Sequence, residues 1–155
     1  MIASFLARIE ASGVATTIGR SMPVTGILSG LHLIGMTLLV GAVVVSTLRL
    51  IGVVLPHEPV AEVTRAARRG IVLGLALSVT TGLLLLSPRI VATSSNYIFQ
   101  LKMLLLCVAV AFHFAIYQGA ARGTSRRVPP GVAGALGLTL WFGVVLAGCA
   151  FILIE

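Results

Sequence analysis

Apolar residues form four long runs along this chain, and short polar segments separate them. The runs predict membrane crossings over residues 23–48, 70–86, 97–119 and 132–154. A helix that crosses a hydrocarbon core of about 30 Å needs about 20 mostly apolar residues, and each run approaches that length. The pattern therefore predicts an all-α protein in which residues 21–155 form a four-transmembrane-helix up-down bundle.

Residues 1–20 show a different pattern, with apolar side chains on one face over about two helical turns. Arg8 and Glu10 lie off this stripe, which is typical of an amphipathic helix in the membrane interface. A signal peptide is not expected, because Glu10 interrupts the run and no apolar core of 7–15 residues is present. The stripe consists of Ile2, Phe5, Leu6 and Ile9.

The composition agrees with a membrane protein and excludes other classes. Apolar residues make up 58% of the 155 positions and charged residues 10%, against about 45–50% and about 25% in soluble domains. A soluble globule, a disordered chain and a disulfide scaffold are therefore excluded. Cys107 and Cys149 both fall inside apolar runs, so we expect two buried thiols rather than a disulfide.

Basic residues predict the orientation of the chain in its membrane. The net charge is +7, which we assign to helix ends rather than to binding of nucleic acid. The loops after the first and third crossings carry most of these charges, and the positive-inside rule places them in the cytoplasm. Both termini are then expected to be periplasmic in a bacterial inner membrane. The basic residues of these two loops are Arg49, Arg65, Arg68, Arg69, Arg122, Arg126 and Arg127.

Small residues recur at helical spacing within the predicted crossings. Gly74, Ser78 and Gly82 stand four residues apart, and Gly35 lies in the first crossing. Such residues let helix backbones approach closely in a membrane, or they leave space for a flat ligand. The sequence alone leaves both interpretations open.

His32 and His113 are the ionisable residues expected at membrane depth, and such residues indicate a functional site by default. Imidazole is a standard axial ligand of haem iron, and helix bundles hold cofactors between facing side chains. We therefore interpret the chain as a haem-b electron-transfer or membrane-anchor subunit of a redox complex, with both histidines on one iron. Gly35 would leave room for a porphyrin edge, and Arg49 is one of the basic residues available to a propionate.

This interpretation implies an exchange of electrons with the quinone pool and a partner subunit, because little of the chain is expected outside the bilayer. It also requires that the two histidines lie at nearly the same height in the membrane. The two histidines are expected to differ in height by ~5–10 Å at 1.5 Å per residue, whereas two ligands of one iron must be nearly level.

Two other functions remain open. Each histidine can instead hydrogen-bond across a helix interface, in a cofactor-free accessory subunit of a larger membrane complex. Alternatively, Cu(I) favours soft ligands, and Met36 and Met103 each lie four residues from His32 and Cys107, respectively. Trp141, with Phe112 and Tyr117, is a weaker candidate for a quinone pocket. The chain contains no Asp, and no Glu falls within a predicted crossing, which disfavours a carboxylate metal site.

The order of several segments resembles a family of small bacterial inner-membrane proteins of unknown function. The matching pieces are GLHLIGMTLLVG, TLRLIGV, VTTGLLL, FQLKMLLL, AFHFAIYQ and VAGALGLTLWFGVVLAG. The resemblance covers nearly the whole chain from Pro23 and implies four crossings after an amphipathic start. Thr47 and Cys149 depart from the family, where relatives carry Asp and Arg. The architecture is also similar, more distantly, to copper-resistance-D-like proteins and b561-type cytochromes.

Overall fold

The computed structural model describes residues 2–117, 119 and 129–154, and all the secondary structure in this part of the chain is helical. The third membrane helix continues as a π-helical turn, η2, and a 3₁₀ turn, η1, joins α4 to α5. The elements are α1 (Ile2–Glu10), α2 (Gly13–Arg20), α3 (Met22–Ile51), α4 (Val60–Leu86), η1 (Ser87–Arg89), α5 (Ile90–Ser94), α6 (Tyr97–Phe112), η2 (His113–Tyr117) and α8 (Pro130–Ile154).

Four helical stretches are long and apolar enough to cross a membrane, as the sequence predicts. They span Met22–Ile51, Val60–Ser94, Tyr97–Ala115 and Gly131–Ala150. These four stretches fit a multi-pass membrane protein. The predicted loop with Arg122, Arg126 and Arg127 lies outside the described residues.

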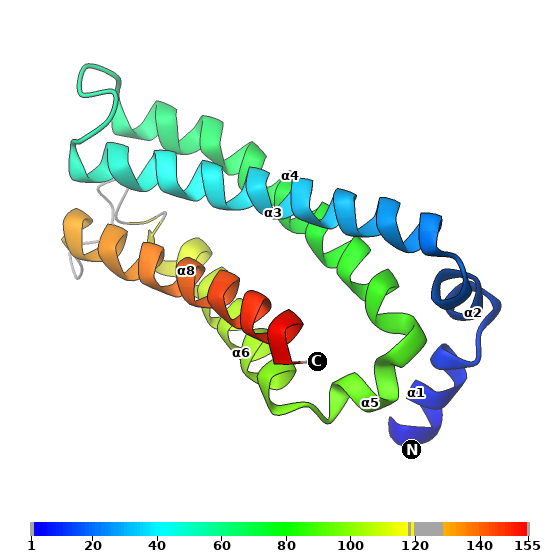
Figure 1. Cartoon of the computed structure of the whole chain (residues 1–155). Coiled ribbons are helices and arrows are strands. Elements are labelled where there is room, and N and C mark those ends of the chain that lie inside the picture. Colours follow the sequence, from blue (N-terminus) through cyan, green and yellow to red (C-terminus); the bar gives the residue numbers. More distant parts are fainter. Residues whose placement is uncertain (1, 118, 120–128, 155) are drawn as a thin grey trace.

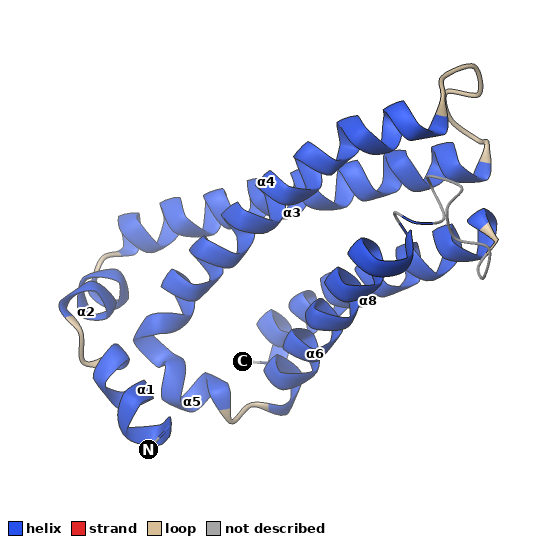
Figure 2. Ribbon diagram, turned by 180° about the vertical axis from the view of Figure 1, so that it is seen from behind, coloured by secondary structure: helices blue, strands red, loops and turns tan. Residues whose placement is uncertain are grey.

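The four long helices form two pairs that diverge towards one end of the molecule. α3 packs along α4, α6 packs along α8, and α3 also contacts α8, whereas α4 and α6 make no comparable interface. Figures 1 and 2 show the two pairs close together near the connection between α3 and α4 and apart near α5. The start of α1 and the end of α8 lie at the diverging end, which we call the open end (Figure 1).

The α3–α4 pair is held by direct contact between the backbones of the two helices. A Cβ atom added at Gly74 would lie 2.6 Å from the Leu39 nitrogen and 2.7 Å from the Gly35 oxygen. A Cβ atom added at Gly35 would lie 2.7 Å from Ser78 Oγ. The small residues of α4 therefore serve as a packing face, which is the arrangement expected for closely packed membrane helices.

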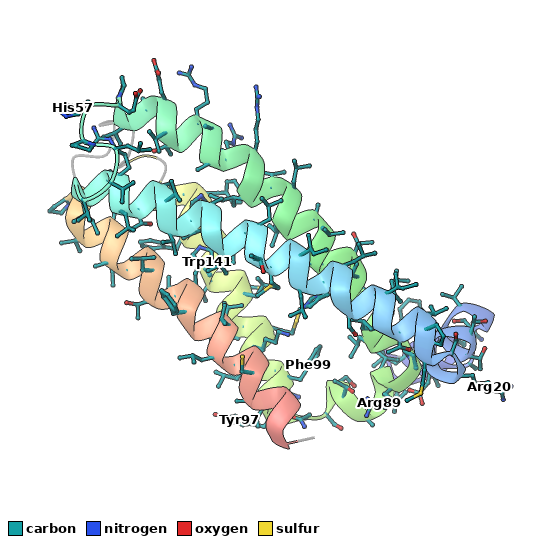
Figure 3. All side chains as sticks on the ribbon, turned by 45° about the horizontal axis from the view of Figure 1, so that its top comes forward. Arg20, His57, Arg89, Tyr97, Phe99 and Trp141 are labelled. Carbon is teal, nitrogen blue, oxygen red and sulfur yellow. The ribbon has the colours of Figure 1, made fainter. Side chains whose placement is uncertain are left out.

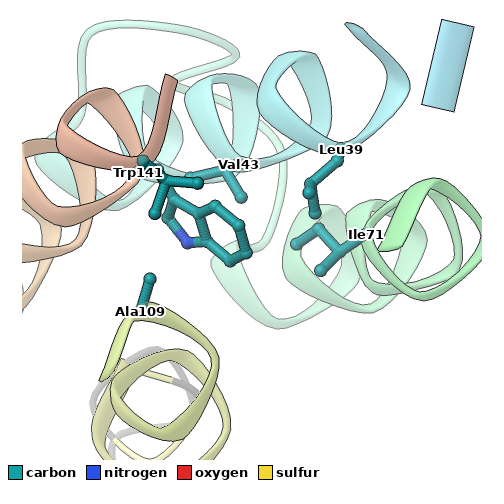
Figure 4. Packing of buried hydrophobic residues seen from close by; sticks show 6 residues of the cluster. Leu39, Val43, Ile71, Ala109 and Trp141 are labelled. Carbon is teal, nitrogen blue, oxygen red and sulfur yellow. The ribbon is translucent and has the colours of Figure 1, made fainter. Parts of the chain in front are cut away.

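A compact apolar cluster connects all four long helices, α3, α4, α6 and α8. Trp141 of α8 is 1% exposed and packs against Leu39 and Val43 of α3, Ile71 of α4 and Ala109 of α6. Figure 4 shows the indole ring between these side chains. Trp141 therefore packs within the protein rather than anchoring it at a membrane surface.

Some helix boundaries differ from those predicted. α4 begins at Val60 rather than near residue 70, because a helix continues through charged residues once it leaves the bilayer. Glu62 lies in its first turn, where a negative charge favours the helix dipole. The segment 1–20 contains two helices instead of one, since Ser12 caps α2 by accepting a hydrogen bond from the Ala15 nitrogen.

The N-terminal helices are attached to the connection between α4 and α6. α1 contacts η1 and α5, and Glu10 Oε2 accepts a hydrogen bond of 3.0 Å from the Val91 nitrogen. Because Val91 is in the first turn of α5, this carboxylate satisfies a backbone donor that has no partner within the helix. The contact joins residues that are 81 positions apart.

Replacement of this carboxylate is expected to loosen α1 without disturbing the long helices. Loss of a capping side chain costs about 0.5–2 kcal/mol, so Glu10→Ala should raise hydrogen exchange in residues 2–10 and 90–94. Hydrogen-exchange mass spectrometry in detergent measures this effect. Glu58→Ala removes a carboxylate from the loop before α4 and serves as the control. Equal exchange in wild type and Glu10→Ala would contradict the assigned contact.

Candidate cofactor-binding cleft

Two neighbouring cavities, of about 510 and 240 Å³, lie between the helix pairs. His32, Met36 and Lys102 line both of them, so we treat the two as one cleft. Cofactor pockets usually measure about 300–1,000 Å³. The larger cavity is otherwise lined by Leu33, Thr37, Val40, Gly41, Val145, Gly148 and Cys149. The smaller one is otherwise lined by Leu39, Leu75, Ser78, Val79, Gly82, Leu83, Leu85, Leu86, Phe99, Met103, Leu106 and Val144.

The imidazole of His32 is held against α4 in a defined orientation. Its Nδ1 atom lies 3.1 Å from Thr81 Oγ1, and this hydroxyl donates its own hydrogen to the Leu77 oxygen at 2.6 Å. When the hydroxyl hydrogen of Thr81 is used in that bond, Thr81 accepts the hydrogen of Nδ1. A Cβ atom added at Gly82 would lie 3.1 Å from Cε1 of the ring, so glycine is the residue that lets the ring lie flush with α4.

This hydrogen bond determines what His32 offers to a ligand. A neutral imidazole with its hydrogen on Nδ1 carries a lone pair on Nε2. His32 also lines both cavities, and Nε2 is the ring nitrogen not used in the contact with Thr81. Metal-binding histidines have this arrangement, in which the second ring nitrogen donates to a neighbouring group that fixes the tautomer. The ring is thus prepared to bind a metal ion or to accept a hydrogen bond.

Lys102 of α6 forms the opposite wall of the cleft. Its Nζ and Cε atoms lie over Gly148 of α8, each 3.5 Å from the position of an added Cβ atom. It lines both cavities together with His32, so the two side chains share the cleft. No acidic side chain lines either cavity among the described residues. The cleft therefore contains one lone-pair donor and one basic nitrogen without a carboxylate.

His113 lies farther from the open end than the cleft that His32 and Lys102 line. It is 1% exposed, begins the π-helical turn η2 and lines neither cavity. Lys102, which shares both cavities with His32, precedes His113 by eleven residues, or about 16 Å along the helix. Metal–imidazole bonds are about 2 Å long, so ligation of one iron by both histidines has no support in this arrangement.

The other two predicted site residues have structural contacts. Ser78 and Gly74 of α4 occupy the space beside Gly35. This packing leaves no room for a ligand at that position. Arg49 holds the loop after α3, since its Nε donates to the Glu58 oxygen at 2.7 Å and its Nη2 donates to the Pro56 oxygen at 3.4 Å. Gly52, at φ +89°, ends α3 before this loop.

The sulfur-containing side chains are only partly gathered in the cleft. Met36 and Met103 line it, and so does Cys149, whereas Cys107 lines neither cavity. Within the described residues, no group of three or more His, Cys, Asp and Glu side chains could hold a metal ion. The described part of the chain therefore gives no support to a copper track through Cys107. Trp141 and Phe112 also line neither cavity, and the side chain of Tyr117 lies outside the described residues.

Three important features of the cleft are not apparent from the sequence alone. Thr81 orients His32 from a helix 49 positions away, and only packing reveals that pair. Gly41 and Gly148, rather than Gly35, are the glycines that line the larger cavity. Lys102 is close enough to a predicted helix end to suggest a side chain directed to the membrane surface. The absence of acidic residues in the predicted crossings is the sequence signal that agrees with a cleft whose described lining contains no carboxylate.

The described helices fit the class of all-helical, multi-pass membrane proteins, and a ligand-sized cleft lies between the two helix pairs. Within that class, the chain belongs to the family described as "Family of unknown function (DUF6644)", whose model matches residues 3–152. No curated protein and no solved structure matches the chain. The family membership agrees with the resemblance to an uncharacterised family, whereas the more distant resemblance to copper-resistance-D-like and b561-type proteins has no support.

Proposed function

We propose that the chain is a membrane-embedded redox subunit that binds one haem b in the cleft between its helix pairs. His32 provides the ligand to the iron. The observation that carries this proposal is the contact of His32 Nδ1 with Thr81 Oγ1 beside the cleft, because a hydrogen placed on Nδ1 leaves the Nε2 lone pair for a metal.

The properties of the cleft support a haem over other ligands that the chain could hold. The walls are apolar except for a few side chains, which suits a porphyrin ring. Arg20 and Arg89 lie at the open end (Figure 3), where basic side chains can meet propionates that reach the membrane surface. A haem bound in a helix bundle supplies one-electron transfer. The chain's own residues orient the ligand and exclude water from it.

We further propose that the open end lies on the periplasmic side of a bacterial inner membrane. The exposed Arg65, Arg68 and Arg69 at the start of α4 are then cytoplasmic, in agreement with the positive-inside rule. The four long helices cross the bilayer in an up-down order, and α1 and α2 lie in the interface. Phe5 and Val14, which are 63% and 59% exposed, would contact lipid there.

A reduced-minus-oxidised absorption spectrum of the detergent-purified protein tests this function. The protein should be expressed with ample haem, and the bound pigment should be extracted and identified. The proposal predicts a b-type spectrum. A colourless, folded protein without bound metal would contradict it and would indicate a cofactor-free accessory subunit, whereas a colourless protein with bound copper would indicate metal handling.

The hydroxyl of Thr81 is expected to matter for haem binding because it orients His32. Thr81→Val keeps the shape of the side chain but removes the acceptor for Nδ1–H. Changes to such supporting groups typically reduce metal affinity by about 10–100-fold, and we expect a loss of that size in haem titrations. Thr80→Val is the matched control, since Thr80 is exposed and donates its hydroxyl hydrogen to the Ala76 oxygen of its own helix. Equal losses in the two variants would contradict the role of Thr81.

A further inference from the structure

We propose that Lys102 is the second axial ligand of the iron, opposite His32. This inference rests on the proposed function, because it assigns a further residue to the same haem. The sequence suggested His113 as the partner of His32, and the proposal assigns that role instead to Lys102, which lines the cleft about three turns earlier on the same helix.

The position of Lys102 is the first argument. Two ligands of one iron must approach it from opposite sides at nearly the same height. His32 and Met36 line both cavities from α3, and Lys102 is the residue that lines both from the facing wall. Met36 is one turn from His32 on the same helix and cannot approach from the opposite side.

The surroundings of Lys102 are the second argument. The side chain is half-buried beside Gly148, with no carboxylate among the described residues that line the cleft. A charged amine at membrane depth is costly unless it is paired or neutralised. Coordination to iron removes that cost, since the amine binds the metal in its neutral form. The glycine at position 148 leaves the space in which the end of this side chain lies.

The ligation step is balanced without an oxidant or a reductant. The Lys102 ammonium releases one proton to solvent, and the nitrogen lone pair that is freed forms a coordinate bond to the iron. The oxidation state of the iron does not change. Release of protons from ligands is the usual accompaniment of metal binding.

Spectroscopy of the haem-loaded full-length protein tests the assignment. Two nitrogen ligands make the ferric iron low-spin, which electron paramagnetic resonance and the visible spectrum both report. We expect a low-spin wild-type protein, and we expect Lys102→Gln to retain haem while converting the iron to high-spin. Lys102→Met should restore a low-spin iron through a thioether ligand and should raise the reduction potential, as methionine ligation does in cytochromes c. Arg65→Gln, which removes an exposed cation at the start of α4 that lines neither cavity, should leave the spin state unchanged.

Two outcomes would overturn this inference while leaving the proposed function intact. A high-spin wild-type protein would show that no second strong ligand is present. A low-spin Lys102→Gln variant with weakened haem binding would show that Lys102 pairs with a propionate instead. Complete absence of haem from the folded wild-type protein would be a different result, because it contradicts the proposed function itself. Thermal unfolding of each variant shows whether it has retained its fold.

Discussion

His32→Ala is expected to abolish haem binding, whereas His113→Ala is expected to retain it. His32 lines the cleft and contacts Thr81, while His113 is buried about 16 Å beyond Lys102 along α6 and η2. Loss of a supporting group already reduces metal affinity by about 10–100-fold. Loss of the ligand itself should therefore reduce affinity by more than about 100-fold, which a haem titration followed by absorption measures.

Controls for this prediction come from the same chain. His57→Ala alters the remaining histidine, in the loop before α4 (Figure 3), and should bind haem as the wild type does. His113→Ala leaves a hole in a buried region and is expected to lower the unfolding temperature, so His113→Gln provides a fuller side chain at that position. Loss of haem from a folded His113→Gln variant would contradict the assignment, and so would full retention by His32→Ala.

Gly74→Val is expected to be the most destabilising change at a single glycine of α4. A Cβ atom at this position would lie 2.6 Å from the Leu39 nitrogen and 2.9 Å from its Cα atom. These are backbone atoms, so a change of side-chain rotamer cannot relieve the clash. The two helices would have to move apart instead. Overpacking usually costs about 1–3 kcal/mol and occasionally more, and we expect a value at or above the upper limit.

Thermal unfolding in detergent, followed through the single tryptophan, measures this effect. Trp141 contacts α3 and α4 in the buried cluster, so its fluorescence reports on separation of the pair. Gly30→Val is the matched control, because a Cβ atom at Gly30 meets nothing within 4 Å. Similar unfolding temperatures for Gly74→Val and Gly30→Val would show that the α3–α4 contact is not formed as described.

The membrane helices could be predicted from the sequence because the bilayer sets the length of an apolar run. The start of α4 could not, since Arg65, Arg68 and Arg69 end the apolar run but do not end the helix. The break at Ser12 depends on a side-chain cap, and the short helix α5 occupies a segment whose serines and threonines are typical of a loop. Local composition does not distinguish such segments from turns.

The candidate site could be predicted only in part. His32 was identified because an ionisable side chain at membrane depth is unusual. Its partners Thr81 and Lys102 belong to other helices, and their pairing depends on the rotation of each helix about its axis. Gly35 illustrates the same limit, because a glycine one turn from His32 suggests space for a ligand until the packing of α4 is known. Periodicity identifies a face, but it does not identify what covers that face.

The most direct test of the account is a titration of the haem-free protein with haem in lipid nanodiscs. The account predicts a Soret change that saturates at one haem per chain. It also predicts parallel quenching of Trp141 fluorescence, because Val144 of the same buried cluster lines the smaller cavity. A folded protein that shows no saturable Soret change would contradict the central claim that this cleft binds haem.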